Sequence, residues 1–260
     1  MGSVSPPGPE LSTRVVHDQL RASILRGEFD SDAPISQVQL AARLGVSRTP
    51  LREALRMLQR EGLIDSEPNR RVRVAQLTVP DLEQLYAARI VIESLGARLA
   101  VPVLTADDLA EMGRLLAGMT EVKDRELQAW DVWHRAFHDL LKRRYGERLS
   151  HTAQDLFDYT ERYRHVYLTE PHALATVEHD HQAIYAACQA GDAVAASVHL
   201  ARHTARAALT VIALAEPEHD PVPVREALRM VTGSGEEAAR AADAAAVRDA
   251  GPGPAPGQPG

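Results

Sequence analysis

The feature that most constrains the fold is a tight turn followed by a short helix over residues 45–60 (GVSRTPLREALRMLQR). Apolar residues recur there at the spacing of one helix face: Leu51, Ala54, Leu55 and Leu58. This pattern predicts that the face is buried. The first turn instead carries small hydroxyls and arginines, which suit phosphate oxygens and guanine edges. The segment is therefore typical of a helix that enters the major groove of DNA.

The flanking residues complete a helix-turn-helix pattern. Residues 36–44 are amphipathic, with Ser36 as the predicted N-cap, and Gly45 suits the left-handed turn at the end of that helix. A strand, a Pro-Asn-Arg-Arg turn and a second strand are predicted over residues 62–74. An arginine-tipped hairpin directly after such a helix is a wing, which can reach the adjacent minor groove or the DNA backbone. The alternative is that the arginines of this helix are only solvent-exposed charges. That interpretation does not explain why a turn, a helix and a hairpin occur together.

Residues 13–76 resemble the winged-helix domain of the GntR family of bacterial transcription regulators. The resemblance is carried by LGVSRTPLREAL at 44–55 and by Glu-Gly-Leu at 61–63. It implies that DNA is contacted by side chains of the second helix and of the wing, namely Ser47, Arg48, Thr49, Arg52, Arg70 and Arg71. The family usually has glycine at the wing tip where this chain has Arg71, and that departure adds a positive charge to the wing.

The net charge of −7 is unevenly divided along the chain. Residues 43–73 contain eight arginines and four acidic residues, a local charge of +4, which leaves −11 for the rest. A basic patch on an acidic protein attracts phosphates to one place and repels them elsewhere. The distribution favours sequence-specific binding of double-stranded DNA over general coating of nucleic acid.

Length and composition predict two domains with tails, since 260 residues with 45% hydrophobic content can bury sizeable cores. The sequence has no run of about 18 apolar residues, so no membrane span is expected. No signal peptide is expected either. The one cysteine, Cys188, lies in an apolar helical pattern and is expected to be a buried thiol. A lone cysteine suits a reducing compartment, so the cytoplasm is the expected location.

We expect four segments along the chain. They are a flexible N-terminus at 1–12, a winged helix-turn-helix domain at 13–76, a helical effector-binding and dimerisation domain at 77–214, and a flexible Ala/Gly/Pro-rich tail at 215–260. Six helices are predicted in the third segment, near 79–101, 106–121, 124–142, 147–168, 171–190 and 193–214. Residues 105–108 (Thr-Ala-Asp-Asp) predict a capping box. Because the connections are short, the predicted fold class is mainly α, a winged helix-turn-helix followed by an antiparallel helical bundle.

The histidines carry the distinctive chemistry of the predicted bundle. His134 and His138 are four residues apart and share a helix face, whereas His181 and His203 fall on later helices. Neutral imidazoles that converge from three helices can bind a divalent transition metal. Ordinary core or surface histidines are the alternative, because eleven histidines offer many accidental pairs.

Residues 79–214 resemble the all-helical FCD effector domain of the FadR-type subgroup of GntR regulators. Arg89-x-x-x-Glu93, Phe137-His138 and the closing pattern at 181–203 carry the resemblance. In metal-binding members the ligands are one aspartate and three histidines, and those positions here are His134, His138, His181 and His203. A fourth imidazole in place of the aspartate favours zinc, nickel or copper over harder metals, with zinc or nickel expected. Asp131 could substitute as a ligand or orient one.

The same resemblance implies a small organic acid as effector. Arg89 is the first candidate to bind it, because guanidinium forms bidentate hydrogen bonds with carboxylates. An ion pair between Arg89 and Glu93 is the alternative, worth about 0.3–0.5 kcal/mol if exposed. Arg162, Tyr163 and Arg164 are further candidates on a later helix.

The expected function is a bacterial repressor that binds a palindromic operator as a homodimer and responds to this effector. A metal-free regulator with an apolar or acyl-ligand pocket is one alternative. A metalloenzyme built on the histidines is another, but the chain has no His-Glu-x-x-His motif, nucleophile elbow or phosphate loop.

Overall fold

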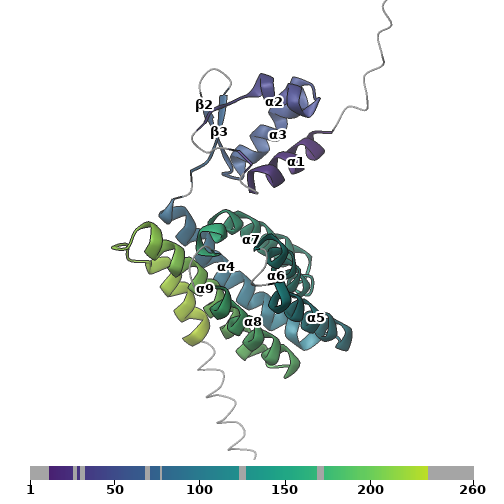
Figure 1. Cartoon of the computed structure of the whole chain (residues 1–260), viewed down its shortest axis with the longest axis vertical. Coiled ribbons are helices and arrows are strands. Elements are labelled where there is room, and N and C mark those ends of the chain that lie inside the picture. The colour runs from purple at the N-terminus through teal and green to yellow at the C-terminus, as the bar shows by residue number, and fades with distance from the viewer. Residues whose placement is uncertain are drawn as a thin grey trace, which may run out of the picture. The chain divides into compact units, whose positions relative to one another are not determined.

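The computed structural model describes residues 12–25, 28–29, 33–67, 71–76, 78–122, 127–168 and 173–233. The chain divides into two compact units, Met1–Thr78 and Val79–Gly260, and each is described by itself. The first combines helices with a small sheet, whereas the second is helical throughout its described residues (Figure 1).

The first unit is a helix-turn-helix with a wing. Its elements are α1 (Thr13–Leu25), β1 (Ile35–Ser36), α2 (Gln37–Leu44), α3 (Arg48–Arg60), β2 (Ile64–Glu67) and β3 (Arg71–Val74). The sheet is antiparallel in the order β1-β3-β2. The sequence did not predict β1, because two residues are too short to show an alternating pattern. The buried face of α3 includes Leu51 and Leu58, and α1 packs against this helix.

The turn between α2 and α3 depends on Gly45. This residue has a φ of 65° and ends α2 in the left-handed conformation predicted for it. Its N–H bonds to the carbonyl of Ala42 at 3.3 Å, and the N–H of Val46 bonds to Ala41 at 3.1 Å. Ser36 occupies the predicted N-cap position of α2 and has an extended backbone. Its hydroxyl makes no capping hydrogen bond to the described part of the chain.

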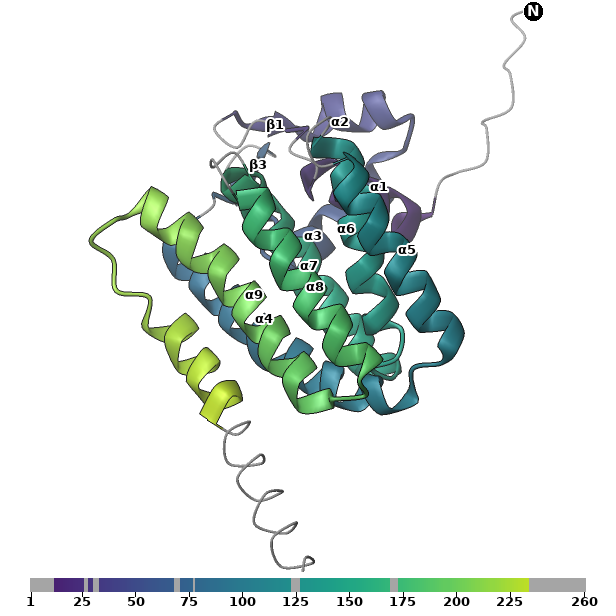
Figure 2. The same cartoon turned by 60° about the horizontal axis from the view of Figure 1, so that its bottom comes forward.

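The second unit is the predicted helical bundle. Its elements are α4 (Val79–Ala100), the 3₁₀ turn η2 (Val101–Val103), α5 (Ala106–Val122), α6 (Leu127–Lys142), α7 (Glu147–Leu168), α8 (Ala173–Gln189) and α9 (Ala193–Ala215). Helix α9 packs against both α4 and α8 (Figure 2), and α5 packs against α6. All six predicted helices are confirmed, with boundaries that differ by a few residues.

The predicted capping box at the start of α5 is confirmed. The hydroxyl oxygen of Thr105 accepts the N–H of Asp108 at 3.1 Å, and the Asp108 carboxylate accepts the N–H of Thr105 at 2.9 Å. Arg144 also donates to this carboxylate at 2.8 Å. The hydrogen bond from Arg144, followed by the one from Thr105, lowers the pKa of Asp108 to about 2.

A further helix at residues 222–233 corrects the prediction of a flexible tail from residue 215. Val224, Ala227 and Val231 are buried in the same apolar cluster as the core of α4 and α9. Before this helix, Nε2 of His219 lies 3.0 Å from the Glu83 carboxylate of α4. Prolines and acidic residues dominate residues 216–221, directly before this helix, and they favoured the prediction of a tail. The N-terminal residues 1–11 and the final residues 234–260 lie outside the described parts of the chain.

The core of the helical unit also holds the single cysteine. Cys188 is buried as predicted, and burial raises the pKa of its thiol to about 12. Such a thiol remains protonated and is a poor nucleophile. Among the described residues, no helix has the length and apolar character needed to cross a membrane.

Candidate functional site

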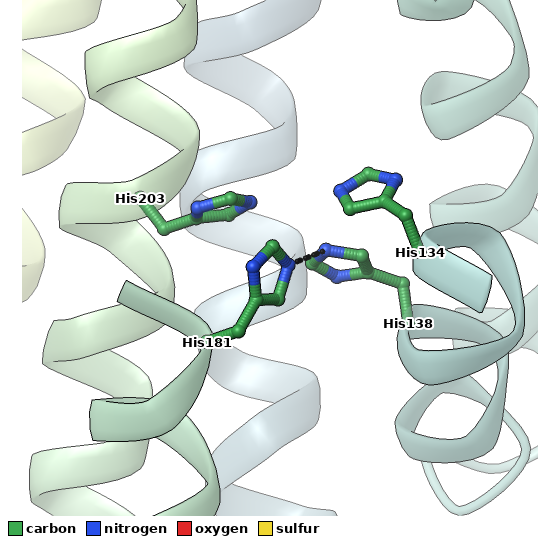
Figure 3. A group of neighbouring side chains, drawn as sticks. All are labelled: His134, His138, His181 and His203. Carbon is green, nitrogen blue, oxygen red and sulfur yellow. Dashed lines mark hydrogen bonds between the residues drawn. The ribbon is translucent and has the colours of Figure 1, made fainter. Parts of the chain in front are cut away.

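Four buried histidine side chains point toward one another inside the helical unit (Figure 3). His134 and His138 come from α6, His181 from α8 and His203 from α9, and none is more than 7% exposed. One possible ligand nitrogen from each lies within 4.8 Å of the others. We call these four residues the histidine cluster. The structure thus brings together the four side chains that the sequence assigned to one site.

The spacing of these nitrogens fits a transition-metal centre. Nε2 of His138 and Nε2 of His181 are 3.1 Å apart. Nitrogens at 2.0–2.1 Å from a tetrahedral zinc ion are about 3.3–3.4 Å from one another. The four possible ligand nitrogens all lie within 4.8 Å of one another, so the widest pairs would draw closer around a bound ion. Neutral nitrogen donors without a carboxylate suit zinc, nickel and copper.

The surroundings of His138 keep its imidazole in the neutral form that binds metals. Burial lowers the pKa of His138 well below its usual value, and the neighbouring His181 and His203 lower it further. The imidazole of His138 is therefore neutral at physiological pH and keeps a lone pair on one nitrogen. Two lone pairs at 3.1 Å repel each other, so a proton or a metal ion must lie between His138 and His181.

Asp180 orients His203 from outside the cluster. Its carboxylate lies 3.6 Å from Nδ1 of His203 and accepts hydrogen bonds of 3.0 and 3.2 Å from Arg206. Burial alone would raise the pKa of Asp180, but His203 and Arg206 outweigh burial and lower it. The ionised carboxylate favours a proton on Nδ1 of His203, which leaves Nε2 for a metal.

Aromatic rings enclose the cluster. Trp130 stacks on His134 with ring centroids 4.6 Å apart and an interplanar angle of 20°. Phe157 contacts His138 at 5.5 Å between ring centroids, and Phe137 contacts His181 edge-on at 5.0 Å. These rings restrict the imidazoles and exclude water from them.

Arg89 lies inside the bundle, close to the histidine cluster. Its Nε donates to the Glu93 carboxylate at 2.7 Å, and Nη1 donates to the Thr160 hydroxyl at 2.6 Å. The guanidinium also lies 4.7 Å from the ring centroid of Phe157. The ion pair with Glu93 is thus formed, but it is buried, and a buried arginine near a candidate metal centre can exchange this partner for a ligand carboxylate.

The other candidate effector residues are less informative. The Tyr163 hydroxyl is buried and donates to the Asp81 carboxylate at 3.0 Å, near the start of α4. The side chains of Arg162 and Arg164 lie outside the described parts of the chain. Asp131 is half-buried and does not belong to the group of four converging ligand atoms.

The sequence did not single out three polar residues near the cluster, Lys142, Thr160 and Asp180. Lys142 follows His138 by one helical turn on α6, and Asp180 directly precedes His181. For Lys142 and Asp180, positions beside predicted ligands were the available signal, and Thr160 had no such signal. Their roles depend on contacts across helices, which spacing along one helix does not reveal.

The candidate DNA-binding side chains that the structure describes are all exposed on the first unit. Ser47, Arg48, Thr49 and Arg52 are exposed at the start of α3, opposite its buried face. Arg71 is exposed at the start of β3, where it pairs with Ser36 and Glu67 in the sheet. Arg70 lies outside the described residues.

The matches to known protein families agree with the division of the chain into two units. Residues 12–74 match the family described as "Bacterial regulatory proteins, gntR family", and residues 84–206 match the FCD domain. The transcriptional repressor GlaR of Escherichia coli is 31% identical over 197 residues, which cover 71% of this chain and 88% of the repressor. The chain belongs to the GntR family of transcriptional regulators. It carries an FCD domain and is a regulator rather than an enzyme.

Another relative and two solved structures extend the comparison. The uncharacterised regulator YdhC of Bacillus subtilis is 26% identical over 193 residues, covering 72% of this chain and 85% of YdhC. The structure of E. coli McbR/YncC has a TM-score of 0.68 at 22% identity, covering 78% of this chain and 98% of that one. A putative GntR regulator from Rhodococcus sp. RHA1 has a TM-score of 0.62 at 25% identity, covering 77% and 97%. The regulator therefore shares the two-part fold of these proteins.

Proposed function

We propose that this GntR regulator is a repressor that binds a palindromic operator as a homodimer in the cytoplasm and responds to a small organic acid. The observation that carries the proposal is the exposed group of hydroxyls and arginines at the start of α3, backed by a buried apolar face. The relative GlaR is named a transcriptional repressor, which supports repression rather than activation.

DNA recognition rests on α3 and the wing. Arg48 and Arg52 reach base edges or phosphates in the major groove, and Ser47 and Thr49 bind the backbone. Arg70 and Arg71 extend the contact along the neighbouring groove. Two such domains in a dimer bind half-sites about one helical turn apart, which gives the operator its palindromic symmetry.

The helical unit supplies the dimer contact. Leu95, Leu99 and Val103 follow one another at four-residue intervals and are 50%, 52% and 57% exposed. Leu95 and Leu99 lie on α4 and Val103 in the following turn η2, and exposed large apolar side chains gathered in this way are typical of a protein–protein contact. Pairing of this row with the same row of a second copy is the symmetric arrangement that a palindromic operator requires.

The histidine cluster holds a divalent metal, with zinc or nickel favoured by its four neutral nitrogens. The organic acid binds beside this centre, and Arg89 pairs with its carboxylate in exchange for Glu93. Because linkage is reciprocal, an acid that lowers operator affinity is itself bound less tightly by the DNA-bound protein. The bound metal supplies a positive charge that attracts the carboxylate, and Arg89 fixes its direction.

The replacement Arg52→Ala tests the placement of the recognition helix. We expect it to lower operator affinity by about tenfold or more, since loss of a bidentate arginine–base contact costs about 1–3 kcal/mol. The operator is first selected from random duplexes with the wild-type protein, and affinity is then measured by fluorescence anisotropy. Arg114→Ala, on the exposed surface of α5, is the matched control. Equal operator affinity of Arg52→Ala and wild-type protein contradicts the proposal.

A further inference from the structure

A buried histidine, His17, connects the first helix of the DNA-binding unit to the end of α3. Its Nε2 lies 2.6 Å from the carboxylate of Glu61, the residue that ends α3. On the other side of the ring, Nδ1 lies 2.8 Å from the carboxylate of Asp18. Arg21, one turn further along α1, lies 3.5 Å from the second carboxylate oxygen of Glu61. These are the charged groups around His17 on α1 and at the end of α3.

The two carboxylates favour one protonation state of this imidazole. A neutral imidazole has one N–H and one lone pair, so it donates to one carboxylate and turns a lone pair toward the other. An imidazolium donates from both nitrogens, and an ionised carboxylate only accepts. The charged form of His17 therefore satisfies both contacts. The contact with Glu61 is also shielded from water, since the two side chains are 8% and 25% exposed.

Glu61 occupies the junction between α3 and the wing. Its N–H bonds to the carbonyl of Met57 at 3.0 Å, which closes the last turn of the helix. Gly62 follows with a φ of 71°, and the buried Leu63 leads directly into β2. A contact that holds Glu61 against α1 therefore fixes the end of α3 and the start of the wing together.

We propose that His17 is a positioning residue for operator binding, and that its charged form holds α3 and the wing in the arrangement that binds DNA. The inference rests on the proposed placement of α3 in the major groove. Histidine changes its charge near physiological pH. Loss of the proton leaves one carboxylate facing a lone pair, so operator affinity falls as the pH rises.

The pH profile of operator binding tests this role. Affinity for the operator selected with wild-type protein is measured by fluorescence anisotropy at fixed salt, because DNA binding depends on salt. We expect the wild-type affinity to fall about threefold or more from pH 6 to pH 8.5. For His17→Gln we expect a change of less than about twofold, because glutamine donates to Glu61 without titrating. Glu61→Gln should flatten the profile in the same way.

The control is His179→Gln, at an exposed position of α8, which should keep the wild-type profile. Circular dichroism verifies that each variant is folded. A fall of equal size in wild type and His17→Gln overturns the inference, and so does a wild-type affinity that does not change with pH. A constant loss of affinity in His17→Gln at every pH also overturns it, because packing alone would then explain the effect.

Hydrogen exchange provides a second measurement that needs no operator. We expect the backbone amides of α1 in wild-type protein to exchange about threefold or more slowly than those of His17→Gln at pH 6, and at equal rates at pH 8.5. Equal rates at pH 6 overturn the role of His17. Wild-type protein that selects no operator contradicts the proposed function, and the exchange rates then still decide whether charged His17 holds α1 on α3.

Discussion

At the scale of single residues, His134 determines the character of the proposed metal centre. With histidine at this position, all four converging donors are neutral imidazoles, so a bound divalent ion retains its full charge. Trp130 stacks on this imidazole and holds its orientation. An aspartate here would add a negative oxygen donor, which harder metals prefer.

The replacement His134→Asp therefore changes metal preference. We expect the affinity for manganese relative to zinc to rise about tenfold or more, because a hard ion gains most from a carboxylate oxygen. Competition titrations of metal-free protein with the two ions measure this ratio. His179→Asp, at an exposed position of α8, is the control and should leave the ratio unchanged. An unaltered ratio in His134→Asp would mean that residue 134 is not a ligand.

The sequence predicted which histidines lie close together, but it did not predict the buried polar residues around them. His134 and His138 share a face because of their four-residue spacing, and resemblance to a known domain supported their grouping with His181 and His203 on later helices. The buried partners Lys142, Thr160 and Asp180 were missed, because each makes a contact across a helix–helix interface, Lys142 with the Phe157 ring. Such contacts depend on packing geometry, which periodicity does not encode.

At the scale of elements, local signals predicted the helices wherever a cap or break was explicit. Thr105 and Asp108 form the predicted box, and Gly45 and Gly191 adopt the positive φ values of 65° and 67° that end their helices. The helix at 222–233 was expected to belong to a flexible tail because prolines and acidic residues precede it at 216–221. Its stability comes from packing against the bundle, as is usual for short helices.

The replacement Asp108→Asn tests the capping box through its pH dependence. The pKa of Asp108 is lowered from 3.8 to about 2, so its ionised form stabilises the fold above about pH 4. That contribution is lost as the pH falls toward about 2. We expect Asp108→Asn to lower the free energy of unfolding by about 1 kcal/mol at pH 7, with a smaller difference from wild type at pH 3. Urea unfolding at both values measures this difference.

The exposed Glu111–Arg114 pair provides the control for that measurement. Glu111→Gln should change the free energy of unfolding little at either pH, since exposed pairs contribute little. An Asp108→Asn effect that is equal at pH 7 and pH 3 would show that the carboxylate charge does not support the cap.

At the scale of the whole molecule, the proposed dimer binds its operator through two linked DNA-binding domains. Leu99→Glu places a charge in the exposed apolar row of α4. We expect this variant to be monomeric in analytical ultracentrifugation and to bind the operator at least about tenfold more weakly, because the second half-site is no longer bound by the same particle. Val132→Glu, at a 69% exposed position of α6, is the matched control. A dimeric Leu99→Glu protein would place the dimer contact elsewhere.

The histidine cluster is the central chemical claim, and the metal content of untagged protein purified without chelator tests it most directly. We expect about one zinc or nickel ion per chain by elemental analysis, and its loss in the double variant His138→Ala/His203→Ala. Wild-type protein that contains no metal, even after incubation with zinc and nickel, would contradict a metal centre at these four residues.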